Sequence, residues 1–192
     1  MRITLFVALL CIASLVLPCA RAQQSEALRK LFLEDKAKAE KGDAVAQYNL
    51  GIRYADGQGV EKDDVEAVKW YRKAAEQNVA SAQSNLGFSY ENGQGVEKDY
   101  AEAVKWYRKA AEQNFAEAQT NLGFGYASGQ GVEKDYAEAY AWYNIASKTS
   151  ADAAKNRDDL EKIMSPQQVA DAQKRTKELR AQIEAKLKSG GR

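Results

Sequence analysis

Three pairs of acidic residues recur along this chain at a fixed spacing, and paired carboxylates of this kind could serve as a general acid and base. The pairs are Asp63/Glu66, Asp99/Glu102 and Asp135/Glu138. Each pair stands where a helix is expected to begin. There the aspartate would accept from free backbone N–H groups and the glutamate would reach back to it, as in a capping box. We therefore interpret the pairs as helix caps and predict no catalytic residue.

Gly-Gln-Gly turns precede these helices, and helix N-termini attract phosphate groups. The turns are residues 57–59, 93–95 and 129–131. No strand is expected before them, no Lys-Ser/Thr pair follows them, and a glutamate stands two residues after each turn. We interpret them as tight turns between helices and predict no cofactor.

The chain has no histidine, and its two cysteines, Cys11 and Cys19, lie near its start. A short positive end, an apolar run from Ile3 to Leu17 and an Ala-x-Ala site predict a signal peptide over residues 1–22. The alternative is a membrane anchor, but the run is short for a bilayer span. Cleavage would remove both cysteines, so the mature chain would have no disulfide and no Cys or His metal ligand. We predict no metal site.

Charge excludes two classes of partner. Removing Arg2 and Arg21 takes the 28 Lys and Arg residues to 26 against 27 Asp and Glu, a net charge of −1. No strong field then attracts nucleic acid or anionic membrane. The sequence also lacks an Asn-x-Ser/Thr site, which favours a bacterial envelope over a eukaryotic secretory route. We expect an exported protein, periplasmic or secreted, that binds no nucleic acid and has no stable membrane insertion.

Three near-copies of one 36-residue unit begin at Ala46, Ala82 and Ala118, and the second matches the first at 27 of 36 positions. Such a period indicates a stacked array in which each unit buries its apolar face against its neighbours. In the first unit Ala46, Leu50 and Tyr54 recur every four residues and predict one face of a short helix.

A second helix follows the glycine turn in each unit. Ala67, Tyr71 and Ala74 form its inward stripe in the first copy. Glycine or asparagine, the residues that best tolerate a left-handed helix stop, follows this helix. The stop positions are Gly42, Asn78 and Asn114.

Three motifs recur in tandem: A-x-x-N-L-G-x-x-Y, G-x-G-V-x-x-D and A-x-x-W-Y-x-x-A-A. Together they resemble the Sel1-like repeat, a relative of the tetratricopeptide repeat with a longer inter-helix loop, over roughly residues 46–153. The resemblance implies an all-α, right-handed α/α solenoid of helix–loop–helix repeats with capping helices at both ends. The expected segments are a signal peptide (1–22), an N-terminal cap (23–45), three repeats (46–81, 82–117, 118–153) and a divergent C-terminal cap (154–192).

The expected C-terminal cap contains one long helix that begins after Ser165. Its apolar face is expected to lie over the open end of the last repeat. The residues of that face are Val169, Ala172, Leu179, Ile183 and Leu187.

The face of the first helices opposite the Leu50/Tyr54 stripe is the predicted binding surface, which in related repeats lines the concave groove. The copies differ there, as expected where different parts of a ligand are contacted. The predicted partner-binding residues are Tyr48, Ile52, Ser84, Phe88, Glu91, Thr120 and Phe124. Three of them, Ile52, Phe88 and Phe124, stay apolar, and they are either anchors for a partner or contacts between neighbouring first helices.

Other repeated residues receive structural interpretations. An asparagine ladder is expected to make inter-helix hydrogen bonds, with a peptide-backbone clamp as the alternative. Trp70 and Trp106 are expected to pack between units. Clusters around Lys69 and Lys105 are expected to form solvated outer faces. The ladder consists of Asn49, Asn85 and Asn121.

The predicted function is a non-enzymatic interaction scaffold or adaptor of the bacterial envelope, a monomer that binds a protein or an extended peptide. One alternative is a cell-wall glycan or peptide binder that uses the groove aromatics. The other is an enzyme of the β-lactam-binding kind suggested for cysteine-rich relatives, whose cysteines this chain lacks.

Overall fold

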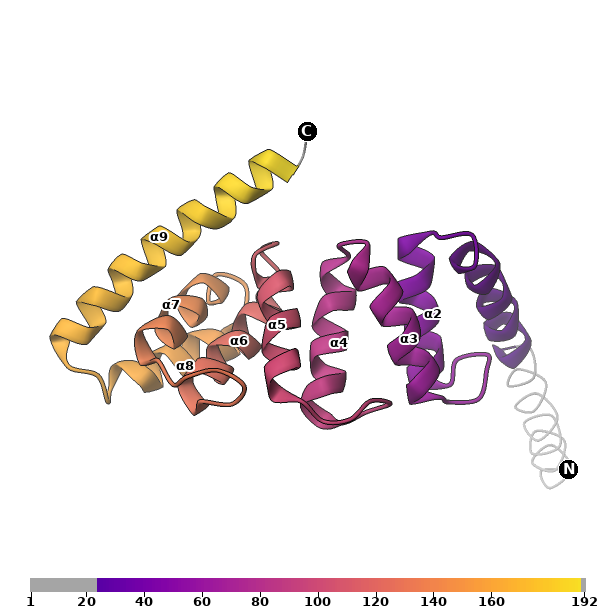
Figure 1. Cartoon of the computed structure of the whole chain (residues 1–192), viewed down its shortest axis with the longest axis horizontal. Helices are drawn as coiled ribbons and strands as arrows, with labels where there is room; N and C mark the ends of the chain where they lie inside the picture. Colours follow the sequence, from indigo (N-terminus) through magenta and orange to yellow (C-terminus); the bar gives the residue numbers. More distant parts are fainter. Residues whose placement is uncertain (1–23, 191–192) are drawn as a thin grey trace, which may run out of the picture.

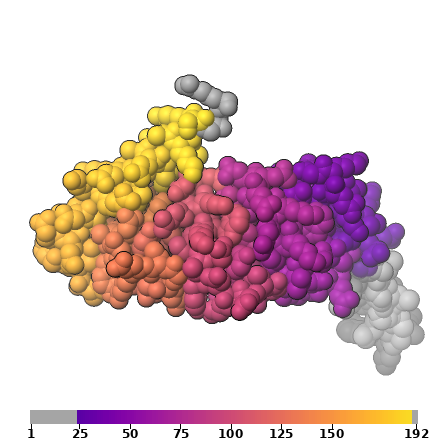
Figure 2. Space-filling model, viewed as in Figure 1, coloured from indigo at the N-terminus to yellow at the C-terminus, as the bar shows by residue number. Residues whose placement is uncertain are grey.

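The structure, a computed structural model, describes residues 24–190, which are helical without any strand (Figure 1). Residues 24–39 form the first helix. The helices that follow are α2 (Ala44–Asp56), α3 (Asp64–Glu76), α4 (Ala80–Asn92), α5 (Tyr100–Ala111), α6 (Ala116–Ser128), α7 (Tyr136–Ala146), α8 (Ala151–Glu161) and α9 (Pro166–Gly190). They succeed one another along the long axis of the molecule until α9 turns back (Figures 1 and 2). The predicted all-α solenoid is confirmed, whereas the predicted signal peptide lies outside the described residues.

The repeat unit is a pair of helices joined by the glycine turn. The pairs are α2/α3, α4/α5 and α6/α7, and each second helix also packs on the first helix of the next pair. The first helices begin at Ala44, Ala80 and Ala116, each two residues before the start of the repeat that was predicted from the sequence. Each unit is therefore stabilised by its neighbours as well as by its own hairpin.

Aspartate caps begin the second helices, as predicted. The Asp63 carboxylate accepts from the backbone N–H groups of Val65 and Glu66 at 3.0 Å, and Asp99 and Asp135 repeat this arrangement. The capping-box half of the prediction was wrong. The Asp63 N–H donates to the Tyr54 carbonyl, so it leaves no donor for Glu66, whose carboxylate pairs with a lysine one turn on.

The predicted helix stops are also present. Gly42, Asn78 and Asn114 have φ values of 93°, 66° and 64°, in the left-handed region. Glycine and asparagine adopt this conformation at lower cost than other residues. The chain therefore reverses at the same point of each copy.

The core repeats with the sequence. Leu50, Leu86 and Leu122 are fully buried, one in each first helix. The glycine that follows each leucine lies against a tyrosine ring of the paired second helix, and a Cβ added at Gly51 would lie only 2.5 Å from Tyr71. The Leu-Gly pair thus lets two helices approach closely.

A ladder of buried glutamines joins the units, and sequence reasoning missed it. The Gln83 amide donates to the carbonyl of Ala75 at 3.1 Å, and Gln113 donates to the Gln83 side-chain oxygen at 2.8 Å. Gln47 and Gln77 repeat that second bond at 2.7 Å. Glutamine at the same position of all three copies was the available signal. The residues at that position are Gln47, Gln83 and Gln119.

The glycine turns are inter-unit contacts. Gly95 lies against the first turn of α3, so an added Cβ would be 2.0 Å from the Asp64 carbonyl oxygen. Gly131 meets the Tyr100 carbonyl in the same way. Only glycine allows this approach, and the structural interpretation of the turns therefore has a direct steric reason.

The predicted tryptophan packing is present as well. Trp70 packs on the cluster that contains Phe32 and Leu50, and Trp106 packs on the cluster that contains Leu86. Each tryptophan therefore joins its own second helix to the preceding unit. Lys73 and Lys109 lie over these rings with the ammonium 4.0 Å from the centroid.

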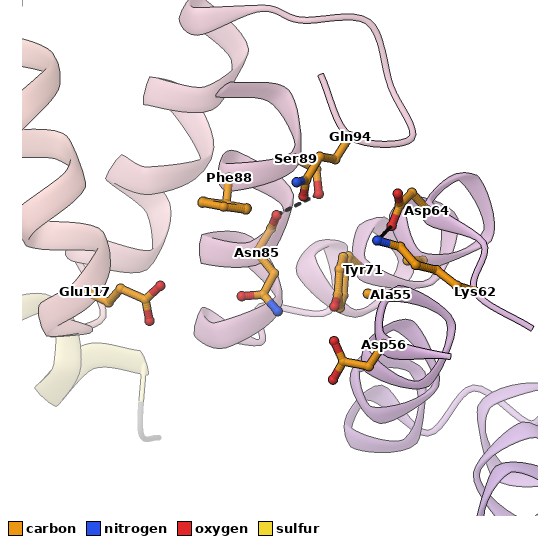
Figure 3. Close-up of a pocket in the computed structure, with 11 residues that line it drawn as sticks. Ala55, Asp56, Lys62, Asp64, Tyr71, Asn85, Phe88, Ser89, Gln94 and Glu117 are labelled. Atoms are coloured by element: carbon orange, nitrogen blue, oxygen red, sulfur yellow. Dashed lines mark hydrogen bonds and ion pairs between the residues drawn. The ribbon is translucent and has the colours of Figure 1, made fainter. Parts of the chain in front are cut away.

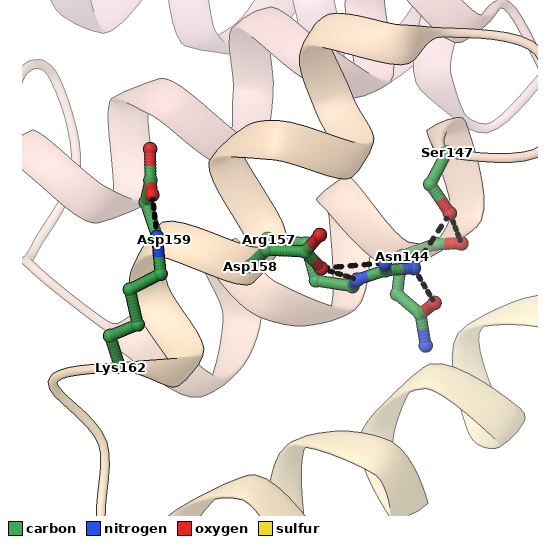
Figure 4. Close-up of polar contacts among 6 residues, drawn as sticks. All are labelled: Asn144, Ser147, Arg157, Asp158, Asp159 and Lys162. Atoms are coloured by element: carbon green, nitrogen blue, oxygen red, sulfur yellow. Dashed lines mark hydrogen bonds and ion pairs between the residues drawn. The ribbon is translucent and has the colours of Figure 1, made fainter.

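The C-terminal helices close the array. On α8, Arg157 donates to Asn144 Oδ1 at 3.4 Å and Ser147 Oγ at 3.3 Å and pairs with Asp158 (Figure 4). The same helix buries Leu160 in the cluster that ends the last repeat.

The expected position of α9 needs a correction. Its beginning does reach the end cluster through Ala172, but Leu179 and Ile183 join the cluster of α5, α6 and α7 instead. The helix therefore runs back along the outer side of α7 (Figure 1). The reason is visible in the third copy. Ala141 and Ile145 occupy the positions where the second copy has Lys105 and Lys109. The outer face of α7 is therefore apolar, and α9 buries it.

Among the described helices, none combines the length and apolar character needed to cross a bilayer.

Candidate partner-binding face

Phe88 and Phe124 are the large apolar side chains that are exposed to solvent on the first helices α4 and α6. They are 46% and 47% exposed, and they occupy the same register one repeat apart. Ile52, at that register on α2, is half-buried and packs on the cluster of Ala67 and Leu86. Of the two interpretations left open, inter-unit packing fits Ile52, whereas the two phenylalanines remain available to a partner.

Another predicted binding residue, Ser84, is buried. Ser84 is 1% exposed, so its side chain cannot contact a partner, and this assignment was wrong. Its counterpart Tyr48 is half-buried with its ring 6.0 Å from the Tyr71 ring. Thr120 donates its hydroxyl to the Ala116 carbonyl within its own helix. The error arose because units flank each first helix on both sides, which leaves a narrower free strip than helical periodicity alone suggests.

Glu91 lies at the end of α4 and makes a specific contact. Its carboxylate accepts from the Tyr107 hydroxyl at 2.6 Å. Burial, that hydrogen bond, and the charges of Glu91 and Glu117 raise the pKa of Tyr107 well above its ordinary value. Glu91 thus fixes the second helix of its own unit while it lies half-buried on the predicted face.

The asparagine ladder makes the predicted inter-helix bonds at two positions. Asn85 hydrogen-bonds the Tyr71 hydroxyl of the preceding unit, and Asn121 does the same for Tyr107. Burial raises the pKa of Tyr71 to about 12, and the Asn85 hydrogen bond acts in the opposite direction. Both hydroxyls therefore keep their protons over the whole physiological range.

A pocket of about 350 Å³ opens beside Phe88 (Figure 3). It spans three units, since its wall comes from α2, α3, α4 and the first turn of α6. The lining residues are Ala55, Asp56, Lys62, Asp64, Ala67, Tyr71, Asn85, Phe88, Ser89, Gln94 and Glu117. Of the seven predicted binding residues, only Phe88 lines this pocket.

The polar wall of this pocket was missed by sequence reasoning. Asp56 and Glu117 stand on opposite sides of it, with Asn85 and Tyr71 between them (Figure 3). Asp56 ends α2, whereas Glu117 lies one repeat beyond Phe88. No periodicity within one helix relates these positions, because stacking of the units brings them together.

The opposite side of the array has a different character. Lys69 and Lys105 are exposed and pair with Glu66 and Glu102 one turn earlier. Arg72 donates to the Tyr90 hydroxyl of the next unit at 2.7 Å. The outer charges were expected to be solvated, and the lysines fit that expectation, but the arginine also links two units.

Comparison with known proteins identifies the repeat. A family model described as Sel1 repeat matches residues 44–79, 80–115 and 116–148. No curated protein gives a significant match. Among solved structures, the chain is 39% identical to a protective antigen of uropathogenic Escherichia coli with an SLR fold. That match has a TM-score of 0.74 and covers 79% of this chain and 33% of the antigen.

Two further structures share the architecture. A Sel1 repeat protein from Oxalobacter formigenes is 41% identical with a TM-score of 0.61, over 71% of this chain and 59% of that one. Cysteine rich protein B of Helicobacter pylori is 25% identical with a TM-score of 0.55, over 68% of this chain and 95% of that one. The present chain thus spans about a third of the E. coli antigen and somewhat over half of the Oxalobacter protein.

Proposed function

Because this chain belongs to the Sel1 repeat family, we propose that it is a non-catalytic scaffold or adaptor of the bacterial cell envelope. Sel1 repeat proteins are generally protein-interaction scaffolds. The proposed partner is a protein or an extended peptide, held along the first-helix face, which we define as the surface formed by α2, α4 and α6 on the side of Phe88 and Phe124. The chain acts as a monomer.

The exposure of two aligned phenylalanines is the observation that carries this proposal. Aromatic side chains are typical anchors of interfaces, where a few of them carry most of the binding energy. Phe88 stands beside a pocket, so a partner can contact both an apolar ring and polar groups below it. This combination of an apolar anchor with a few polar groups is common in binding sites.

The acidic pairs that could suggest catalysis have other roles. Asp63 and its equivalents cap helices, while Glu66 and Glu102 pair with lysines. In the third copy Glu138 pairs with Arg175 of α9. Each carboxylate is therefore accounted for by a structural contact, which supports a binding function.

Export is the second part of the proposal, and it depends on the predicted signal peptide. The first 22 residues have the positive end, the apolar run and the Ala-x-Ala site of a signal peptide. N-terminal sequencing of the protein from fractionated cells tests this part. We expect a mature chain that starts at Gln23 in the envelope fraction, and an intact Met1 or a purely cytosolic protein would contradict export.

Binding is tested by capture from envelope extract. The mature protein, the double variant Phe88→Ala/Phe124→Ala and the outer-face variant Lys105→Ala are immobilised at equal density. A partner held by the first-helix face is recovered with the wild-type and Lys105→Ala proteins and lost with the double variant. Sedimentation of the mature protein with purified cell wall distinguishes glycan binding from binding to a protein partner. Cosedimentation without a captured protein would refute the scaffold proposal.

A further inference from the structure

The first-helix face carries negative charge without basic counterparts on two of its helices. Helices α4 and α6 contain no lysine or arginine, and their charged residues are Glu91 and Glu117. In α2 the single basic residue, Arg53, pairs with Asp35 at 2.6 Å. The lysines of the second helices lie on the outer face instead. The lysines of the outer face are thus paired with glutamates, whereas Glu91 and Glu117 on the first-helix face have no ion pair among residues 24–190.

The pocket beside Phe88 concentrates this charge. Three carboxylates line it, and Lys62 is its one lining cation. Lys62 pairs with Asp64 at 3.4 Å, which leaves Asp56 and Glu117 without an ion pair among residues 24–190. Within the described part of the chain, the Asp56 carboxylate accepts from the Gln58 amide at 3.1 Å. Both carboxylates are exposed, so a ligand can reach them.

The remaining wall suits a flat or elongated cation. The Phe88 ring offers an apolar and π-rich surface, against which an arginine or lysine stem packs favourably. The Asn85 side chain and Tyr71 hydroxyl lie between the two carboxylates (Figure 3). A guanidinium group has five donors in a fixed plane and binds carboxylates with charge-assisted hydrogen bonds.

Tyr107 is affected by the same carboxylates of this face. After burial, the hydrogen bond from its hydroxyl to Glu91 and the charges of Glu91 and Glu117 all raise the pKa of Tyr107. A cation on the first-helix face would relieve this accumulation of negative charge. An acidic ligand would add to it and would be repelled.

We propose that the Phe88 pocket takes an arginine or lysine side chain from an extended segment of the partner, with Asp56 and Glu117 as the charged groups that select it. This inference rests on the proposed function, since it names the chemistry of the partner at the same face. The neighbouring residues of the segment lie along α4 toward Phe124.

The test uses an array of 11-residue peptides made of Gly, Ser, Ala, Leu and Phe, whose central residue is Arg, Lys, Gln or Glu. Labelled mature protein is applied to the array, and hits are titrated by fluorescence anisotropy. We expect peptides with central Arg or Lys to bind about tenfold more tightly than their Gln counterparts, because the Gln peptides lack a charge-assisted hydrogen bond to the pocket carboxylates. This preference should weaken as salt screens the charges.

Two matched double variants locate the selectivity. Asp56→Asn/Glu117→Gln should abolish the preference for a basic centre, whereas Glu76→Gln/Glu184→Gln removes two carboxylates elsewhere and should preserve it. Equal binding of Gln and Arg peptides, a preference that survives Asp56→Asn/Glu117→Gln, or no binding to any peptide would each overturn the inference. Thermal melts by circular dichroism verify that the variants remain folded.

Failure of this inference is distinguishable from failure of the proposed function. If Phe88→Ala weakens peptides that show no basic preference, the first-helix face binds and the cation assignment is wrong. If Phe88→Ala has no effect while Asp56→Asn/Glu117→Gln removes a basic preference, the cation site stands and the aromatic anchor is wrong.

Discussion

The Tyr107 hydroxyl donates a 2.6 Å hydrogen bond to Glu91, which ties α5 to the last turn of α4. The equivalent tyrosines, Tyr71 and Tyr143, are also buried, and burial raises the pKa of each to about 12. The three hydroxyls therefore keep their protons in the folded chain under conditions in which an unfolded tyrosine, with its ordinary pKa of 10.0, loses its proton.

This difference predicts alkaline destabilisation. A group whose folded pKa is raised stabilises the fold fully below its unfolded pKa, and that contribution is lost as the pH rises toward the folded pKa. We expect the free energy of unfolding to fall between about pH 10 and 12, by at most roughly 1.4 kcal/mol per pH unit for each tyrosine. Urea unfolding followed by circular dichroism measures it. Tyr107→Phe should reduce the slope, and an unchanged slope would contradict the assignment.

The central leucine of the middle repeat should be among the costliest side chains to truncate. Leu86 is fully buried, so Leu86→Ala leaves a cavity and should lower the free energy of unfolding by roughly 2–5 kcal/mol. Val65, which is exposed on α3, provides the control. Val65→Ala should change stability by less than about 0.5 kcal/mol. Similar losses for the two variants in urea titrations would refute the predicted core.

The glutamine ladder should contribute to stability, both within a repeat and between neighbouring repeats. Gln83→Ala removes its hydrogen bonds to the Ala75 carbonyl and from the Gln113 amide, which together should cost roughly 1–3 kcal/mol. The double variant Gln83→Ala/Gln113→Ala should cost less than the two single changes together, because they share one bond. Gln167→Ala, on the exposed start of α9, is the control. Strict additivity in the cycle would show that the Gln83–Gln113 bond contributes nothing to stability.

Much of the fold followed from the repeat pattern, and the exceptions have physical causes. The Leu50 register, the aspartate caps and the Asn78 stop each depend on a few neighbouring residues, so one copy of the repeat contains the necessary information. The cover of α7 by α9 was missed because it depends on contacts between distant segments. Yet the change from Lys109 to Ile145 at equivalent positions was a visible signal of that contact.

The candidate site was only partly predictable for the same reason. Phe88 was predicted because an apolar side chain on a polar strip is visible in one helix, and the structure shows it exposed beside the pocket. Ser84 was misassigned because burial by the adjacent unit is absent from a single-helix projection. Asp56 and Glu117 were missed because they come together only when three units stack.

Removal of residues 165–192 should expose the outer face of α7. Ala141 and Ile145 are buried in the full chain, in the same cluster as Leu179 and Ile183 of α9. We expect the truncated protein to aggregate and to melt at a lower temperature, as followed by light scattering and calorimetry. Ile183→Asp in the full chain should weaken the same contact. A truncated protein that stays monomeric with an unchanged melting temperature would show that α9 is dispensable.

The most direct test of the account is the affinity of the captured partner for Phe88→Ala, measured by calorimetric titration beside Lys105→Ala. Phe88 is half-exposed on the first-helix face, whereas Lys105 lies on the outer face. With circular dichroism showing both variants folded, Phe88→Ala should weaken binding by roughly 1–3 kcal/mol and Lys105→Ala should leave it nearly unchanged. Normal binding by a folded Phe88→Ala variant together with weakened binding by Lys105→Ala would place the partner on the outer face and contradict the account.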